Sequence, residues 1–141
     1  MGEAQIKDLL KQIVHISEED WHTLRQRSPG VYRFFERIQD VANARIVAEV
    51  TESRYCAAGL QVGQRIVVEA GALVPAQCTA PLCMRALGPL TGFVNTILEQ
   101  IVAGVDPNDR VFMTAECLDP GLEAGGLGKV RFRVTVEPVG K

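Results

Sequence analysis

The spacing of apolar residues changes near residue 44, from a helical period to a strand period. Within residues 1–44, apolar residues recur three and four positions apart, which is typical of one face of a helix. The clearest set is Ile6, Leu9, Leu10 and Ile13. Ser17, and Ser28 followed by proline, are start signals for two further helices. We therefore expect a helical arm of three short helices that packs on the sheet or forms a dimer interface.

Beyond residue 44, apolar and polar residues alternate with a period of two. Such runs predict strands at residues 45–51, 65–69, 110–116 and 129–137. Strict alternation means that one face of each strand is buried and the other is wet, which favours an antiparallel sheet. We expect the first and last of these strands to be neighbours.

A helical stretch separates the second and third expected strands. Thr79 is a suitable cap, and Pro81 then falls in the first turn, where its missing N–H does no harm. We expect Gly88–Pro89 to interrupt this stretch before a strong apolar stripe over residues 90–101. The fold class is therefore α+β. A small antiparallel sheet is packed by the helices of residues 81–103, with an N-terminal helical arm (1–44) and a cysteine-containing core (45–141) in one compact domain.

Charge and composition exclude several function classes. The 141 residues carry 15 lysines and arginines against 17 acids, and the arginines are scattered, which argues against nucleic-acid binding. No apolar run approaches the roughly 20 residues that cross a bilayer. The first residues contain acids where an export signal needs basic and then apolar ones. We therefore expect a cytoplasmic protein with no nucleic-acid or membrane partner.

Four cysteines are the most informative chemistry-bearing residues. Without an export signal, they are expected as free thiols or metal ligands rather than disulfides. Three lie at ends of expected elements, where sites form: Cys56, Cys83 and Cys117. The fourth, Cys78, makes a C-x4-C spacing with Cys83 that is looser than a zinc knuckle.

The cysteines allow three interpretations. All four could ligate zinc or an iron–sulfur cluster, with Asp119 orienting the ligands. A helix N-terminus favours the thiolate, so Cys83 is the best nucleophile for an enzyme, with Asp119 or Glu116 as acid or base. The third interpretation is that the cysteines are small hydrophobic residues packed in the core.

Two other features favour structural roles. The glycine-rich segment 121–128 lies between two expected strands and opens no helix, so a flexible hairpin connection is favoured over a phosphate loop. His15 and His22 are separated by the start signal at Ser17 and are far from any cysteine in sequence. A Cys–His pair or zinc site would need tertiary approach, so surface or packing histidines are favoured.

Three segments resemble a family of small uncharacterised prokaryotic proteins with C-x-x-G-H-x-x-G-D, C-x-x-A-L and C-P-D motifs. The matching residues are Cys56, Gly59, Gly63, Cys83, Ala86, Leu87, Cys117 and Asp119. Leu60, Gln64 and Leu118 replace the family's histidine, aspartate and proline. The resemblance covers residues 45–138 and brings no activity with it. It implies that three cysteines cluster, and that Cys78 could replace a lost ligand.

The sequence thus predicts a binding or accessory protein with a cysteine-lined pocket for a metal, a cluster or a small ligand. One alternative is a thiol-dependent enzyme that uses Cys83. Another is a structural subunit of a larger enzyme complex. The N-terminal helical arm would serve either to form a homo-oligomer or to bind a partner enzyme.

Overall fold

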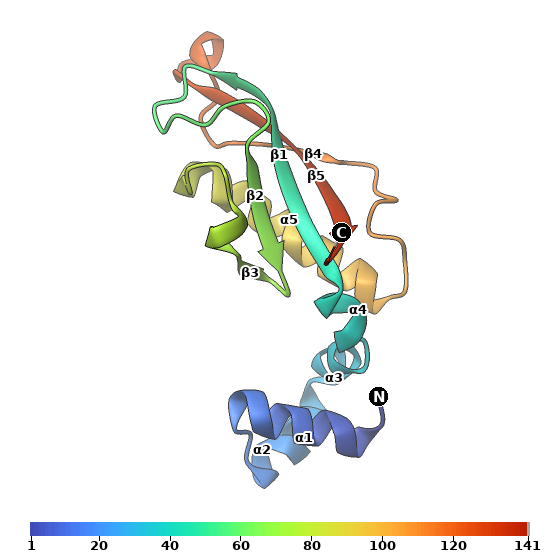
Figure 1. Cartoon of the computed structure of the whole chain (residues 1–141). Coiled ribbons are helices and arrows are strands. Elements are labelled where there is room, and N and C mark those ends of the chain that lie inside the picture. Colours follow the sequence, from blue (N-terminus) through green and yellow to red (C-terminus); the bar gives the residue numbers. More distant parts are fainter. Residues whose placement is uncertain (141) are drawn as a thin grey trace. The chain divides into compact units, whose positions relative to one another are not determined.

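The computed structural model describes residues 1–140, which fold as parts of two compact units, Met1–Asp40 and Val41–Lys141 (Figure 1). Each unit is described by itself below. The change between them falls close to the change in apolar spacing near residue 44.

The first unit is helical, as the sequence predicts. It contains α1 (Glu3–Val14), α2 (Glu18–Arg27) and α3 (Pro29–Glu36), and the short α4 (Ile38–Ala42) follows. Ser17 caps α2 as expected, since its Oγ accepts a hydrogen bond from the Asp20 N–H at 3.1 Å. Pro29 opens α3 as expected, but the side chain of Ser28, at the N-cap position, makes no capping hydrogen bond. The sole tryptophan, Trp21, is buried with Ile6 and Leu10 in a small core.

The second unit is built on a five-stranded sheet in the order β3-β2-β1-β5-β4, and every neighbouring pair is antiparallel. The strands are β1 (Ala44–Arg54), β2 (Arg65–Glu69), β3 (Ala72–Leu73), β4 (Thr114–Glu116) and β5 (Lys129–Pro138). The α+β class is confirmed, and β1 and β5, the first and last long strands, are neighbours as expected.

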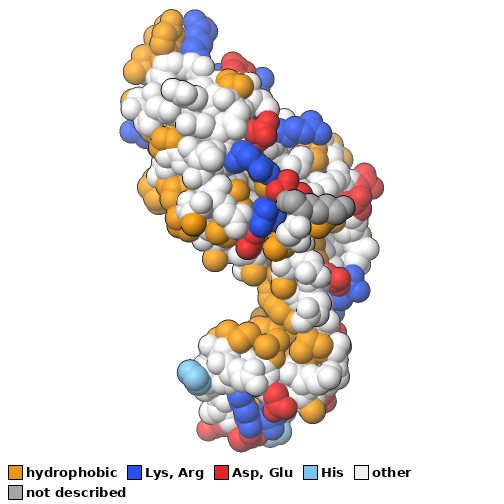
Figure 2. Space-filling view, viewed as in Figure 1, with side chains coloured by type: hydrophobic (Ala, Val, Ile, Leu, Met, Phe, Trp, Pro, Cys, Tyr) orange, Lys and Arg blue, Asp and Glu red, His pale blue; other side chains and the backbone are white. Residues whose placement is uncertain are grey.

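The helix α5 (Met84–Val102) covers one face of this sheet. Leu90 and Val94 of the helix pack on Ile46 and Ala48 of β1 and on Val134 of β5. The opposite face carries ion pairs around a small buried apolar patch of Val47 and Val67. Arg45 pairs with Glu69 at 2.8 Å and Arg65 with Glu137 at 2.9 Å, and Figure 2 shows basic and acidic side chains side by side there. One buried face and one largely polar face explain most of the alternation in the sequence.

The start of α5 differs from the expected one. Cys83 is the N-cap, and α5 begins at Met84. The hydroxyl of Thr79 instead accepts a hydrogen bond from the Arg65 N–H at 2.8 Å, which ties the preceding loop to β2. The predicted interruption at Gly88–Pro89 is also wrong, because α5 runs through both residues.

The third expected strand is shorter than its alternation suggests. Only Thr114–Glu116 of the predicted 110–116 run forms a strand. At the start of that run, the guanidinium of Arg110 turns inward and donates to the carbonyl oxygens of Pro107 and Val134. The residues before β4 therefore serve to anchor a side chain rather than to extend the sheet.

Candidate functional site

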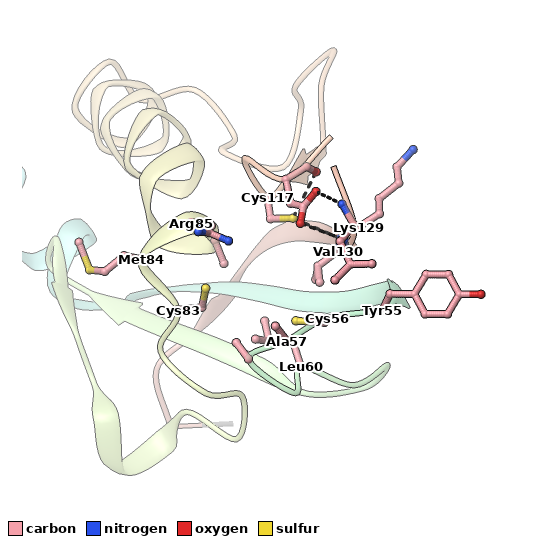
Figure 3. A pocket seen from close by; sticks show the side chains of 15 residues that line it. Tyr55, Cys56, Ala57, Leu60, Cys83, Met84, Arg85, Cys117, Lys129 and Val130 are labelled. Atoms are coloured by element: carbon pink, nitrogen blue, oxygen red, sulfur yellow. Dashed lines mark hydrogen bonds between the residues drawn. The ribbon is translucent and has the colours of Figure 1, made fainter. Parts of the chain in front are cut away.

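A pocket of about 490 Å³ lies at one end of the second unit (Figure 3). Four segments line it: the end of β1 with the loop that follows, the start of α5, the chain after β4, and the start of β5. Most of the lining is apolar, and the volume falls within the usual range of about 300–1,000 Å³ for small-molecule sites.

Three of the four predicted site cysteines line this pocket: Cys56, Cys83 and Cys117. Each is half-buried and free of disulfide bonds. Cys56 lies in the loop after β1, Cys83 caps α5, and Cys117 directly follows β4. Figure 3 shows the three side chains around one hollow. Thiols that lie 27 and 34 positions apart in the sequence thus meet at one site.

A tight turn and a close approach place Cys56. Gly59 donates a backbone hydrogen bond to the Cys56 carbonyl at 3.1 Å, and its φ of +82° suits glycine. Gly128, the residue before β5, passes against the same loop. A Cβ at Gly128 would lie 2.9 Å from the Tyr55 carbonyl oxygen and 3.4 Å from the Cys56 Cα. The absence of a side chain there lets the two segments meet.

A proline inside α5 positions Cys117 near Cys83. Pro89 has no N–H, so the carbonyl of Arg85, one turn earlier, loses its helical donor. The N–H of Leu118 donates to that carbonyl instead, at 3.0 Å. The residue after Cys117 is therefore hydrogen-bonded to the first turn of α5, which explains how the helix tolerates the proline.

The three pocket thiols differ in their hydrogen bonds. Cys117 Sγ accepts from the Val130 N–H at 3.4 Å and donates to the Asp119 carbonyl at 3.7 Å. Within residues 1–140, neither Cys56 Sγ nor Cys83 Sγ has a hydrogen-bond partner. Cys117 is thus held in place, whereas the other two thiols are available to a bound molecule.

Asp119 organises the loop between β4 and β5. Its carboxylate accepts backbone N–H bonds from Leu127 at 3.0 Å, Gly121 at 3.1 Å and Gly128 at 2.8 Å. These bonds, with a smaller contribution from Arg85, hold the pKa of Asp119 below its usual value. A carboxylate so fully occupied is a poor acid or base at neutral pH.

The glycine-rich segment 121–128 joins two strands, as its position in the sequence indicates. Its backbone N–H groups do bind an anion, but that anion is the chain's own Asp119 carboxylate. Sequence analysis placed Asp119 near the cysteines and missed this role. The available signal was an aspartate two residues before the first glycine of the segment.

Two other predicted site residues lie elsewhere. Cys78 sits at the edge of β2, where its Sγ accepts from the Val67 N–H at 3.2 Å and donates to the Val74 carbonyl at 3.4 Å. It does not line the pocket. Glu116 pairs with Arg131 at 2.7 Å on the sheet, and that hydrogen bond lowers the pKa of Glu116. Glu116 is likewise absent from the pocket lining.

Two cations border the pocket, Arg85 and Lys129. Lys129 lies 3.9 Å from a carboxylate oxygen of Glu116, whereas Arg85 has no ion-pair partner within residues 1–140. Sequence analysis missed both. The rim therefore offers positive charge beside thiols and apolar walls.

The site is not a ready-made metal centre. Within the described part of the chain, no three His, Cys, Asp or Glu side chains lie where they could hold one metal ion. The two histidines, His15 and His22, are exposed in the helical unit, while all four cysteines belong to the other unit. A metal would require the pocket thiols to move closer together, to sulfur–sulfur distances of about 4 Å.

Comparisons with known proteins give no match: no family model, no curated protein and no solved structure is significantly similar to the chain. Among residues 1–140, no helix is both long enough and apolar enough to span a bilayer.

Proposed function

We propose that this protein binds a small organic molecule in the cysteine-lined pocket. The observation that carries the proposal is the convergence of Cys56, Cys83 and Cys117 from three segments on one pocket. The volume of about 490 Å³ suits a small organic molecule and is far larger than a bare ion requires.

The lining indicates the chemistry of the ligand. Apolar side chains such as Leu60 and Val130 would pack on its body. Lys129 at the rim favours an anionic group. Cys56 and Cys83, whose thiols have no hydrogen bond within residues 1–140, favour a soft or electrophilic group near the pocket centre. The class proposed is thus an apolar anion with a thiol-reactive or polarisable part.

A fluorescent probe tests this proposal. Anilinonaphthalene sulfonate combines an apolar ring system with one negative charge and fluoresces on entering apolar sites. We expect saturable binding that slows iodoacetamide alkylation of the three pocket cysteines. Cys78, which lies outside the pocket, is the internal control and should alkylate at an unchanged rate.

A filled pocket provides the matched variant. Ala57 is exposed and lines the pocket, so Ala57→Trp should block the probe without disturbing the core. Ala76, which is also exposed but lies outside the pocket, gives the control Ala76→Trp. Equal probe binding by both variants, or no protection of the pocket thiols, would contradict the proposal.

A thiophilic metal is the alternative ligand for the same residues. Anaerobic titration with Co²⁺ would then produce thiolate charge-transfer absorption. The absorption would be lost in Cys56→Ser, Cys83→Ser and Cys117→Ser but retained in Cys78→Ser. Iron or zinc in the protein as purified would point the same way, and either result would replace the organic ligand by a metal or a cluster.

A thiol enzyme is the second candidate, and the position of Cys83 favours it. This residue caps a 19-residue helix, so its thiol lies at the positive end of the helix dipole. Peptide mapping after brief alkylation should then show Cys83 modified before Cys56. If Cys83 reacts no faster than Cys78, the enzyme hypothesis fails while the binding proposal stands.

A further inference from the structure

Exposed apolar side chains flank the face of α5 that points away from the sheet. Val111 is 90% exposed, Phe112 is 77% exposed and Leu118 is 67% exposed. Val111 and Phe112 border a second pocket of about 530 Å³ that runs along α5 from Pro89 to Gln100, next to Gly92 and Thr96. Leu118 lies on the N-terminal half, where its Cδ1 would be 3.7 Å from a Cβ at Gly88. Large apolar side chains at such exposure mark interaction surfaces when they lie together.

The face of α5 that points away from the sheet has a charged residue towards each end and a glycine, without a side chain, at its centre. Arg85 and Glu99 each lie seven positions from Gly92, on opposite sides, so they share its face about 10.5 Å away along the axis. Both are exposed, and neither has an ion-pair partner within residues 1–140. A Cβ at Gly92 would meet nothing within 4 Å.

We propose that α5 associates with α5 of a second copy of this chain, antiparallel and centred on Gly92. A two-fold axis at Gly92 brings Arg85 of each copy opposite Glu99 of the other. The interface therefore contains two identical Arg85–Glu99 ion pairs. A parallel pairing would place like charges together. The pattern of charges therefore selects both the occupant and its direction.

The apolar side chains fit the same arrangement. Phe112 and Val111 lie beside the stretch of α5 from Pro89 to Gln100, and Leu118 lies beside Gly88, nearer the N-terminus. An antiparallel partner reverses this order, so Phe112 of one copy packs near Leu118 of the other. The second pocket is then filled from the partner, and the exposed apolar residues are removed from water. Apart from Arg85, this surface is separate from the cysteine pocket.

Charge reversal of the full-length chain tests the pairing. We expect a dimer by sedimentation equilibrium for the unmodified chain. Arg85→Glu and Glu99→Arg should each raise the dimer dissociation constant roughly tenfold, because attraction becomes repulsion at two places. An equimolar mixture of the two variants should dimerise again, since each supplies the charge that the other lacks. The double variant Arg85→Glu/Glu99→Arg should also dimerise.

Two further variants complete the test. Gly92→Arg places a long side chain at the centre of the interface and should yield a monomer with unchanged circular dichroism. Glu49→Arg, on the opposite face of the sheet, is the control and should leave the dimer intact. A chain that is monomeric at all concentrations overturns the proposal. A dimer that survives Gly92→Arg and both single charge reversals also overturns it, and would point to the N-terminal helices instead.

Discussion

Gly128 is the position at which a single methyl group should damage both the fold and the pocket. Gly128 is not in the left-handed region, so alanine is compatible with its backbone conformation. The effect of Gly128→Ala therefore comes from space alone. The added Cβ would lie 2.9 Å from the Tyr55 carbonyl oxygen, which belongs to the backbone and cannot rotate away.

The magnitude follows from this contact. Overpacking of a close approach typically costs about 1–3 kcal/mol. For a unit of about 100 residues, each kcal/mol lowers the melting temperature by roughly 4–8 °C. The start of β5 must also move away from Cys56, whose Cα would be 3.4 Å from the new methyl group. We expect Cys56 to alkylate faster relative to Cys78.

The assay must report on the second unit. The only tryptophan, Trp21, lies in Met1–Asp40, so its fluorescence follows the other unit. Far-UV circular dichroism and calorimetry are therefore the appropriate measurements. Gly30→Ala in α3 is the matched control, because its Cβ meets only Arg33 Nη2 at 3.8 Å and alanine favours a helix. A melting temperature of Gly128→Ala within 1 °C of the unmodified chain, with unchanged Cys56 labelling, would refute the reasoning.

Three further predictions concern other parts of the chain. Cys78→Ala removes the acceptor for an N–H of β2 and should destabilise the second unit by about 1 kcal/mol, whereas Cys78→Ser should not; thermal melting measures this. Because the pKa of Asp119 is depressed in the folded protein, its carboxylate stabilises the second unit above its ordinary pKa of 3.8, and this stability is lost as the pH falls through the folded pKa. In Asp119→Asn, the melting temperature of the second unit should therefore depend less on pH below about pH 4. Hydrogen bonds from two lysines lower the pKa of Glu18 from 4.5 to about 2, so the stability that Glu18 gives the helical unit should be lost as the pH falls from 4.5 towards 2. Trp21 fluorescence measures this loss, which should be absent in Glu18→Gln.

The strands could be predicted from sequence because their alternation has a simple cause. One face of the sheet packs on α5 and the other carries ion pairs, so the polarity of most strand residues reports their face; Val47 and Val67, which are buried beneath the ion pairs, are exceptions. The helix start could not be predicted in the same way. Thr79 is a good cap by type, but its hydroxyl bonds to a strand that is distant in sequence. Pro89 is a helix breaker by type, but Leu118 supplies the missing donor.

The same distinction applies to the candidate site. Three cysteines lie at the ends of elements that meet at one end of the sheet: Cys56, Cys83 and Cys117. Their positions at element ends are visible in the sequence, so a shared pocket could be predicted from the order of the elements. Cys78 resembles them in sequence but lies on a sheet edge, and that depends on how the loop after β3 folds back. The role of Asp119 depends on backbone N–H directions, which residue types do not specify.

The sheet's two borders have a consequence for how this protein meets other molecules. The outermost strands contain two and three residues, while the long strands of eleven and ten residues lie inside. Beyond β4, the side chains of Asn108 and Arg110 hydrogen-bond to the backbone of Val136 and Val134 and so cover the free edge of β5. Little unpaired backbone is therefore offered to an incoming chain, which discourages fibril growth and recognition of extended peptides by strand addition. Whatever docks on this protein must do so by matching side chains.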